Sequence, residues 1–583
     1  MAMSKEKRKQ FAVTTLLINL FSCLTVVFFS PMEVVLINQH EFYFAFLNAA
    51  LFQLVAALAA AGLATLVMVY LPSRAGILLA GLSLGGGIAA YVQALFLNGS
   101  MVAMTGKSME VSGTTKAVNL IIWIALIAAA VLLLWRQRKP VITAARCVAA
   151  ALIVMQGAAM IGSITTNGMA EKGDALFLTA ESQFEFSSGN NVIEIVLDTT
   201  DGTVVREMLE RYPELYDSLA GWVYYPNATS KNSRTYPSLP YMLTGKECFY
   251  DRPAEEYVQE AFDSSPFLPG LKEAGTDICL YTTDTDIIGN SAAAYTRNSL
   301  LYDYSQLNNL DPVQLVKNLM HVGLYKSMPY VLKEKFSYKT GIINISSFRG
   351  FEKRAYRFRE EDAMFYQDFQ AAGGLSVSSE YSKAYRLYHL FGNHPGYMWD
   401  QNMEITTGAD QPDALRGSFR IIEMLISEMK RLGIYDDATI IVTADHGMSN
   451  LGGKTLEIEQ TYCPLLMVKY PKQNETEPMQ INEAPVAHDD LFATIEDALG
   501  AKRTGCGSGK SLNEFSAGDE RERIYYYTAF YDNKEGEIVL REYQVTGNAE
   551  DIRNWHLTGR WWDVQYSRHK VAQRRFAEIT GEP

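Results

Sequence analysis

The chain has 583 residues, 48% of them hydrophobic, and a formal net charge of −13 at pH 7. This acidic balance excludes the broad basic surface that binds nucleic acid, so we expect no nucleic-acid partner. The length allows one large domain with additional segments. Because most of the excess hydrophobic residues lie before about residue 166, the chain divides into an apolar first part and a second part with the composition of a water-soluble protein.

Five long apolar runs follow one another in the first part. They cover 11–31, 44–71, 75–97, 117–135 and 142–163. At about 1.5 Å per residue, each run is long enough to cross a hydrocarbon layer of about 30 Å. One such run alone is also compatible with a buried core helix or a signal peptide. Five in succession with polar hinges predict a transmembrane domain over residues 1–165.

Charges in the loops orient this domain. The cations before the first run, between the second and third runs, and between the fourth and fifth runs are Lys5, Lys7, Arg8, Lys9, Arg74, Arg136, Arg138, Lys139 and Arg146. The opposite loops carry two cations, Lys107 and Lys116. The positive-inside rule then places the N-terminus in the cytoplasm. We expect a multi-pass protein of the cytoplasmic membrane whose second part, after five crossings, is extracytoplasmic.

The second part is predicted to be an α/β domain. Residues 166–190 are polar and weakly periodic, which is typical of a linker, and the globular domain is expected over 191–510. Strands are predicted at 191–197, 277–282, 339–345, 384–391, 438–444 and 464–469, and helices near 203–220, 254–274 and 411–433. This alternation indicates a central, mostly parallel sheet flanked by helices. Residues 511–583 are interpreted as a C-terminal extension whose strands close the domain edge.

Three of the predicted strand ends carry side chains suited to chemistry. Asp198 follows the first strand, Asp445 and His446 follow the strand at 438–444, and His394 lies in the turn after 384–391. Taken singly, such an aspartate caps a helix and a Gly-Asn-His-Pro segment forms a turn. In parallel sheets, however, ligands gather at these ends. Together with the Thr235 hydroxyl they form an oxygen-rich set that suits one divalent metal, Mn²⁺ or Zn²⁺, with Mg²⁺ as a further candidate.

Three motifs carry a family resemblance. They are Ala-Asp-His-Gly at 444–447, Thr-Tyr-Pro-Ser-Leu-Pro-Tyr-Met at 235–242, and Gly-Asn-His-Pro-Gly-Tyr at 392–397. The first two follow the frame of the sulfatase branch of the alkaline phosphatase superfamily, which the chain resembles over about 191–510. With five apolar runs ahead of them, the motifs are similar to those of lipoteichoic acid synthases and lipid A phosphoethanolamine transferases, which read Thr-x-x-Ser-Val-Pro-x-Met and Gly-Ser-His-Gly-Pro-x-Tyr.

The resemblance implies one catalytic divalent metal held by four side chains: Asp198, Thr235, Asp445 and His446. It makes Thr235 the nucleophile that becomes phosphorylated. It also implies that His394 contacts the phosphoryl oxygens or the leaving group, and acts as proton donor and later acceptor.

The chain departs from these families at several positions. A sulfatase carries cysteine where Thr235 stands and arginine where Leu239 stands, so formylglycine chemistry on sulfate esters is disfavoured. The transferases usually carry glutamate at Asp198 and a further histidine about a dozen residues after the Asp-His pair, where this chain has a Gly-Gly-Lys454 loop. Lys454 is a candidate for phosphate binding, with solvated surface as its alternative, and Arg234 is a second candidate.

We therefore predict metal-dependent transfer of phosphoglycerol or phosphoethanolamine from a phospholipid headgroup to an envelope polysaccharide or lipid acceptor, through a phosphothreonine intermediate. Two alternatives remain: a membrane-anchored phosphodiesterase, phosphatase or sulfatase-type hydrolase, and an envelope scaffold without activity. The donor headgroup, the acceptor and the oligomeric state stay open. His389 is interpreted as a core histidine or a support for a ligand, and one disulfide, for example between Cys248 and Cys279, is compatible with the sequence.

Overall fold

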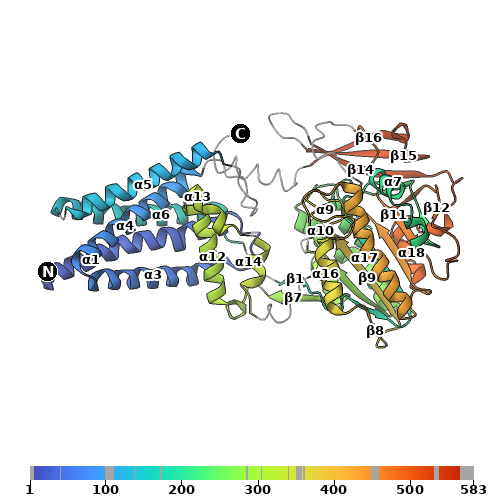
Figure 1. Ribbon diagram of the computed structural model, residues 1–583, viewed down its shortest axis with the longest axis horizontal. Coiled ribbons are helices and arrows are strands. Elements are labelled where there is room, and N and C mark those ends of the chain that lie inside the picture. The colour runs from blue at the N-terminus through green and yellow to red at the C-terminus, as the bar shows by residue number, and fades with distance from the viewer. Residues whose placement is uncertain are drawn as a thin grey trace. The chain divides into compact units, whose positions relative to one another are not determined.

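The computed structural model describes residues 5–564 except 40, 99–110, 137, 171–173, 284–286, 304, 339, 350–357, 359–360, 448–457 and 531–537. The chain forms two compact units, labelled element by element in Figure 1. The helical unit comprises 1–175 and 302–354, and the α/β unit comprises 176–301 and 355–583. The division falls within two paired strands, β1 (Asp174–Leu178) and β7 (Ser299–Asp303).

The helical unit contains five helices long and apolar enough to cross a membrane, as predicted. The first span joins α1 (Lys5–Cys23), the π-helical η1 (Leu24–Phe29) and α2 (Ser30–Ile37). The others are α3 (Phe46–Tyr70), α4 (Ser73–Val92) with the π-helical η2 (Gln93–Leu97), α5 (Gly113–Trp135) and α6 (Lys139–Asn167). Each predicted run therefore corresponds to one helix.

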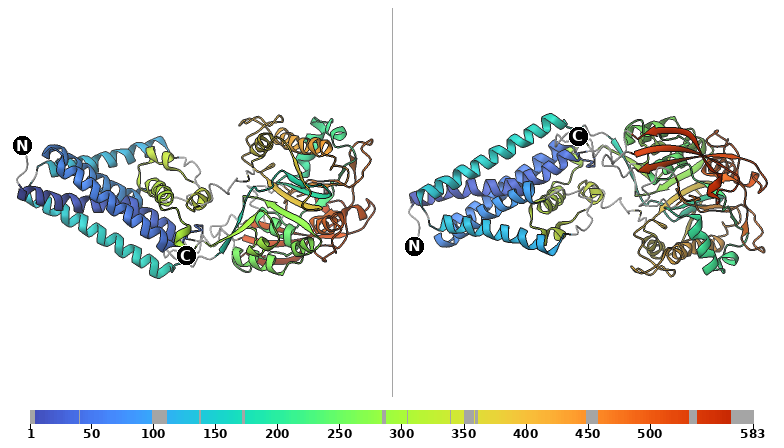
Figure 2. Two further views of the ribbon diagram at one scale, coloured as in Figure 1. Left: turned by 90° about the horizontal axis from the view of Figure 1, so that it is seen from below. Right: turned by 90° about the horizontal axis from the view of Figure 1, so that it is seen from above.

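A second group of helices in this unit was not predicted. Its members are η5 (Leu307–Asn309), α12 (Pro312–Ser327), α13 (Tyr330–Lys333), η6 (Glu334–Phe336) and α14 (Thr340–Ser346). Figures 1 and 2 show α12, α13 and α14 at the end of the bundle away from the N-terminus.

The strand predicted at 339–345 is wrong, because α14 occupies this segment. Its isoleucines favour a strand, but no strand lies beside it among the described residues. Asn344 instead accepts from Tyr43 N at 3.0 Å and donates to Glu41 O at 2.7 Å. These contacts to the loop before α3 outweigh the local β-propensity.

The α/β unit is built on a seven-stranded sheet in the order β12-β4-β11-β10-β3-β9-β6. β10, β3, β9 and β6 are parallel neighbours, whereas β11 is antiparallel to both β10 and β4, so the sheet is mixed with one reversed strand. The strands are β3 (Asn190–Leu197), β4 (Val223–Tyr224), β6 (Thr276–Tyr281), β9 (Lys383–Leu390), β10 (Thr439–Thr443), β11 (Leu466–Lys469) and β12 (Gln480–Ile481).

Helices cover both faces of this sheet, as predicted. Along β3, Val192 and Val196 enter one core, whereas Ile193, Ile195 and Leu197 enter the other, because successive side chains of a strand alternate. The first core also contains residues of α9 (Thr235–Thr244), α10 (Ala254–Ser264), α11 (Phe267–Glu273) and α18 (Leu491–Ala498). The second contains residues of α7 (Gly202–Arg211), α8 (Leu215–Ser218), α16 (Asp362–Ala372) and α17 (Gln411–Arg431).

Short strands lie outside the central sheet. The segment predicted as a linker, 166–190, contains β1 and β2 (Glu185–Ser187), and β2 pairs with β8 (Ser376–Ser378). β5 (Ala228–Thr229) pairs with β13 (Val486–Ala487). The predicted domain limits otherwise stay predictions. All six cysteines are free, so the suggested bridge between Cys248 and Cys279 is wrong.

The C-terminal extension forms an antiparallel sheet of β14 (Glu522–Phe530), β15 (Ile538–Thr546) and β16 (Trp555–Asp563). Its first strand contacts the segment that leads to α9. Tyr526 N donates to Lys231 O at 2.9 Å, and Ser233 N donates to Tyr526 O at 3.2 Å. The extension therefore holds the backbone just before Thr235.

Candidate metal and phosphoryl-transfer site

The candidate site lies where three neighbouring strands end. β10, β3 and β9 are adjacent and parallel, so their carboxyl ends meet at one edge of the sheet. Asp198 directly follows β3, Asp445 and His446 lie just past β10, and His389 is the second-last residue of β9. All four residues are buried, with exposed fractions of 8% or less. The fold thus gathers residues that are far apart in the sequence.

Thr235 reaches this cluster from the first position of α9. Its Oγ1 donates to Asp198 Oδ1 at 3.4 Å and lies 3.4 Å from His446 Nε2. The start of a helix exposes backbone N–H groups and carries a partial positive charge, which favours an anionic phosphoryl group beside the hydroxyl. The Thr235 hydroxyl therefore lies near carboxylate and imidazole groups, at a helix N-terminus that favours bound anions.

Asp445 is the most constrained carboxylate of the cluster. Its Oδ1 accepts from Thr199 N at 3.0 Å and from His446 N at 2.9 Å. Its Oδ2 is buried, accepts no hydrogen bond and lies 3.5 Å from His446 Nε2. Burial acts to raise the pKa of Asp445, but the charges of His446 and His389 and the Thr199 hydrogen bond hold this pKa below its usual value. The carboxylate is thus kept ionised while one oxygen stays available to a cation.

The arrangement fits a divalent cation. Ligand atoms of Asp198, His389 and Asp445 all lie within 4.8 Å of one another. His446 Nε2 is 3.9 Å from Asp198 Oδ1, so a second imidazole faces the same carboxylate. Two carboxylates, two imidazoles and one hydroxyl match the donors preferred by Zn²⁺ and Mn²⁺. The buried, unbonded Asp445 Oδ2 is the atom that most requires such an ion.

His389 is the residue that sequence reasoning undervalued. Its Nε2 lies 3.9 Å from Asp198 Oδ2, and its Nδ1 shares a 3.2 Å hydrogen bond with Thr282 Oγ1. A metal-binding histidine commonly has its second ring nitrogen held in this way. The only sequence signal for His389 was its place at the end of a strand whose neighbours also end in polar residues.

Two special backbone positions shape the edge. Thr199 adopts a left-handed conformation with φ 57°, while its hydroxyl donates to Asp198 Oδ1 at 2.5 Å. Gly392 also has a positive φ, 54°, and a Cβ there would lie 2.6 Å from the Leu197 carbonyl carbon. Left-handed residues other than glycine are costly and concentrate at functional sites. Thr199 directly follows Asp198, and Gly392 lies against the backbone of Leu197 and Asp198.

The remaining predicted site residues are placed differently. His394 contacts the Phe391 ring, with centroids 5.0 Å apart, and its Nδ1 lies 3.1 Å from Pro395 O. Within the described part of the chain it makes no hydrogen bond to Thr235. Arg234 occupies the N-cap position of α9, directly before Thr235, and its backbone is extended. Lys454 lies outside the described residues, so its predicted role is not addressed.

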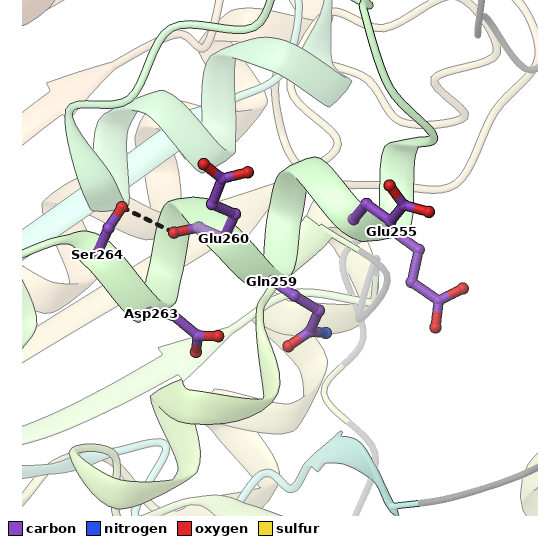
Figure 3. Close-up of a pocket in the computed structure, with 6 residues that line it drawn as sticks. Glu255, Gln259, Glu260, Asp263 and Ser264 are labelled. Atoms are coloured by element: carbon purple, nitrogen blue, oxygen red, sulfur yellow. Dashed lines mark hydrogen bonds between the residues drawn. The ribbon is translucent and has the colours of Figure 1, made fainter.

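A separate hollow follows the exposed side of α10 and contains none of these residues. It is lined by Glu255, Glu256, Gln259, Glu260, Asp263 and Ser264, most of them drawn in Figure 3, where Ser264 Oγ donates to Glu260 O at 2.7 Å. Its acidic lining would repel a phosphodiester. The hollow is therefore separate from the candidate site at the strand ends.

Comparison with known proteins gives one family match within the α/β unit. The sulfatase family model matches residues 420–501, which contain most of α17, all of β10 and the Asp445-His446 pair. No curated protein matches the chain.

Several solved structures align with the α/β part. A phosphonate monoester hydrolase from Silicibacter pomeroyi is 17% identical, with a TM-score of 0.35, 67% of this chain covered and 94% of that one. The lipoteichoic acid synthase LtaP from Listeria monocytogenes is 12% identical, with a TM-score of 0.33 and coverages of 70% and 97%. An alkaline phosphatase superfamily protein from Vibrio parahaemolyticus is 13% identical, with a TM-score of 0.33 and coverages of 68% and 88%.

The fold and the site define an α/β protein with a buried group of metal-binding side chains at the carboxyl edge of its sheet. A sulfatase family model matches part of the α/β unit, residues 420–501, and five apolar helices belong to the other unit. This match agrees with the sulfatase resemblance stated from the sequence motifs.

Proposed function

We propose that this protein transfers a phospho-alcohol, phosphoglycerol or phosphoethanolamine, from a phospholipid headgroup to an envelope glycan or lipid through a phosphorylated Thr235. The observation that carries the proposal is the Thr235 hydroxyl itself, 3.4 Å from both Asp198 Oδ1 and His446 Nε2 at the start of α9. A hydroxyl in this environment is suited to attack phosphorus. Formylglycine cannot arise from it.

The proposed location is the cytoplasmic membrane, with the α/β unit outside the cell. The basic residues of the helical unit support this orientation, because they gather at the N-terminal end of the bundle. The Arg8 guanidinium lies 4.7 Å from the centroid of the Tyr70 ring, and Arg146 donates to Gln10 O at 2.9 Å. Cytoplasmic loops are the ones that carry such an excess of cations.

The first proposed step forms a bond between Thr235 Oγ1 and the lipid phosphorus and breaks the bond from phosphorus to the diacylglycerol oxygen. The Thr235 proton passes toward Asp198 Oδ1, which accepts from the hydroxyl. His394 protonates the departing oxygen. A divalent metal bound by Asp198, Asp445, His446 and Thr235, with His389 close by, would lower the hydroxyl pKa and stabilise charge on the phosphoryl oxygens.

The second step reverses the roles. An acceptor hydroxyl attacks the phosphorus, its proton goes to His394, the bond between phosphorus and Thr235 Oγ1 breaks, and Thr235 Oγ1 takes its proton back from Asp198. The helix N-terminus at Thr235 favours the anionic phosphoryl group throughout. Attachment to membrane spans keeps the site near lipid donors and so raises their effective concentration.

The test uses the full chain in liposomes that contain phosphatidylglycerol or phosphatidylethanolamine labelled in the headgroup. After acid quenching, peptide mass spectrometry should find the labelled phospho-alcohol on Thr235, and its mass names the donor. Thr235→Ala should lower turnover by about 10⁴-fold, whereas Thr235→Ser, which keeps a hydroxyl, should retain part of it.

Two results would redirect the proposal. Full turnover by Thr235→Ala would remove the phosphothreonine mechanism. Release of the labelled phospho-alcohol to water at an equal rate with and without an acceptor alcohol would instead identify a hydrolase.

A further inference from the structure

The helices α12, α13 and α14, here called the α12–α14 layer (residues 312–338 and 340–346), belong to the helical unit, and α12 packs against the first span. Gly323 is required at this contact, because a Cβ there would lie 2.4 Å from Val26 O. Lys326 Nζ pairs with Glu33 at 2.8 Å, and the lysine side chain is 11% exposed. The layer is therefore a fixed part of the bundle.

Hydrogen bonds also join the layer to two other spans. Tyr330 N donates to Asn119 Oδ1 on α5 at 3.1 Å, and the Tyr330 hydroxyl donates to Leu97 O at the end of η2 at 2.5 Å. Asn98 Nδ2 donates to Lys326 O at 3.0 Å. Three spans thus meet the layer through polar groups at the same end of the bundle.

This end coincides with the expected edge of the hydrocarbon layer. In each of the three spans, the contacted residue lies about 20 residues from the basic residue at the other end, which is the number needed to cross a bilayer core. The pairs are Lys9 and Glu33, Arg74 and Leu97, and Arg136 and Asn119. The layer therefore lies at the depth of the phospholipid headgroups.

The side of α12 turned away from the bundle is apolar as well as basic. Leu315, Leu319 and Val322 are fully buried, whereas Val313 and Met320 are 78% and 37% exposed. Exposed residues three to four positions apart share one helix face, and Lys317 lies between these two on the same face. Val313 and Met320 thus form a second apolar stripe of α12, which stays exposed in the described part of the chain.

The other two helices of the layer also carry exposed apolar side chains. Val331 and Leu332 on α13 are 44% and 37% exposed, and Ile342 on α14 is 48% exposed. Exposed cations accompany them, Lys317 and Lys335. Large exposed apolar side chains gathered on one group of helices are typical of an interaction surface.

Two features identify phospholipid as what covers this surface. The spans beside it present their own exposed apolar side chains at the same end, including Phe96 at 71% and Val118 at 52%, so the surface continues the one that faces lipid. Charge agrees: residues 311–338 contain four lysines and two acids, in a chain whose net charge is −13. Lysines on an apolar helix face bind lipid phosphates while their stems stay in the apolar region.

We propose that the α12–α14 layer is immersed in the headgroup region of the bilayer, where Val313, Met320, Val331, Leu332 and Ile342 enter the acyl boundary and Lys317 and Lys335 bind the phosphates of anionic phospholipids. The inference depends on the membrane spans and not on the transfer reaction. Such an immersed layer would hold lipid headgroups beside the extracytoplasmic end of the bundle. These headgroups would be available as donors for the proposed transfer reaction.

The test places a fluorophore at Ile342→Cys in the full chain, with the accessible thiols removed by Cys147→Ala and Cys506→Ser. Ile481→Cys on β12 is the matched control, because Ile481 is the same residue type and is 51% exposed. The protein is reconstituted at one copy per nanodisc with lipids that carry a nitroxide in the headgroup or near the acyl terminus. Headgroup nitroxides should quench the Ile342 label several times more strongly than the Ile481 label.

Every other outcome overturns the proposal. Equal, weak quenching at both positions would show that the face is in water, and quenching that appears only with two copies per disc would show that a second copy covers it. Stronger quenching by the acyl-terminal nitroxide would place α14 deeper than the headgroups.

A second measurement addresses the lysines. Changing Lys317 and Lys335 to glutamine should lower the preference of the Ile342 label for nitroxide-labelled phosphatidylglycerol over phosphatidylcholine by about fivefold for each lysine. Lys502→Gln, at an exposed lysine of the α/β unit, is the control and should change nothing. An unchanged preference in the double variant would exclude phosphate binding. Because turnover is not measured, failure of this test and failure of the transfer reaction are distinguishable.

Discussion

The helical unit and the α/β unit bury polar side chains in opposite ways. In the bundle, Gln93 Oε1 accepts from Asn119 Nδ2 at 2.7 Å and from Trp123 Nε1 at 3.0 Å, so neutral groups satisfy one another. At the strand ends, Asp198 and Asp445 bring two negative charges together. A complete neutral network rigidifies a structure, whereas adjacent buried carboxylates require a cation. The first arrangement is suited to assembly and the second to catalysis.

The largest expected effect comes from removing one charge of the site. Asp445→Asn should abolish stoichiometric metal binding and lower turnover by about 10³-fold or more, because a ligand oxygen is lost and the balance of charge changes. Bound metal, measured by elemental analysis of the purified protein, is the readout. Asp437→Asn, at a surface aspartate whose side chain is 60% exposed, should leave both quantities unchanged. Full metal occupancy in Asp445→Asn would refute the assigned site.

A buried carboxyl away from the site gives the next effect. Burial raises the pKa of Glu194 on β3 to about 7, although the hydrogen bond from Tyr385 opposes this rise. The folded state then holds a proton that the unfolded chain releases near pH 4.5. Stability from this group is fully present below pH 4.5 and is lost as pH rises through 7, by about 3 kcal/mol in total.

The free energy of unfolding at pH 5 and at pH 8.5 measures this loss. Glu194→Gln should remove about 3 kcal/mol of the difference between the two pH values, because the amide does not ionise. An unchanged difference would show that Glu194 does not titrate as described. The result would distinguish an isolated buried carboxyl from the pair of carboxylates at the candidate metal site.

Removal of the Thr282 hydroxyl, which holds His389, should lower metal affinity less than removal of a direct ligand. Thr282→Val removes the 3.2 Å hydrogen bond to His389 Nδ1 with little change of shape. Metal affinity should fall by about 10- to 100-fold, since supporting hydrogen bonds orient a metal-binding imidazole. Competition with a chelator measures the affinity, and Thr282→Ser should restore it. If valine and serine bind metal equally, His389 has only a packing role.

The smallest effect is expected in the bundle. Gly323→Ala should destabilise the helical unit by about 1–3 kcal/mol, because its Cβ cannot be placed against Val26 O without a shift. Gly62→Ala is the matched control: nothing lies within 4 Å of its Cβ, and alanine favours the helix. Thermal unfolding in nanodiscs compares the two. A stabilising Gly323→Ala would mean that the α12–α14 layer is not fixed to the first span.

The local pattern of hydrophobic residues was sufficient to predict much of the fold. The five spans and the strands β3, β6, β9, β10 and β11 were predictable because continuous apolar runs and short β-branched runs have few other solutions. Asp198, Thr235, Asp445 and His446 were predicted as metal ligands, because strand ends and motif spacing mark them. The structure brings the first two within 3.4 Å of each other.

One error and one undervalued residue have a common origin. Residues 339–345 were predicted as a strand from their isoleucines, yet α14 contacts the loop before α3, some 300 residues earlier. His389 was interpreted as a core histidine or a support for a ligand, and the structure adds that its Nε2 lies 3.9 Å from Asp198 Oδ2. Both outcomes depend on contacts between distant segments, which a local window does not contain.

The amino-acid sequence by itself determined which segments are apolar enough to enter a membrane and which strands deliver carboxylates, because both are properties of neighbouring residues. Only the tertiary structure decided that β10, β3 and β9 lie side by side and that an insertion between β6 and β9 joins the spans. The physical reason is that these outcomes are set by the burial of surfaces contributed by distant parts of the chain.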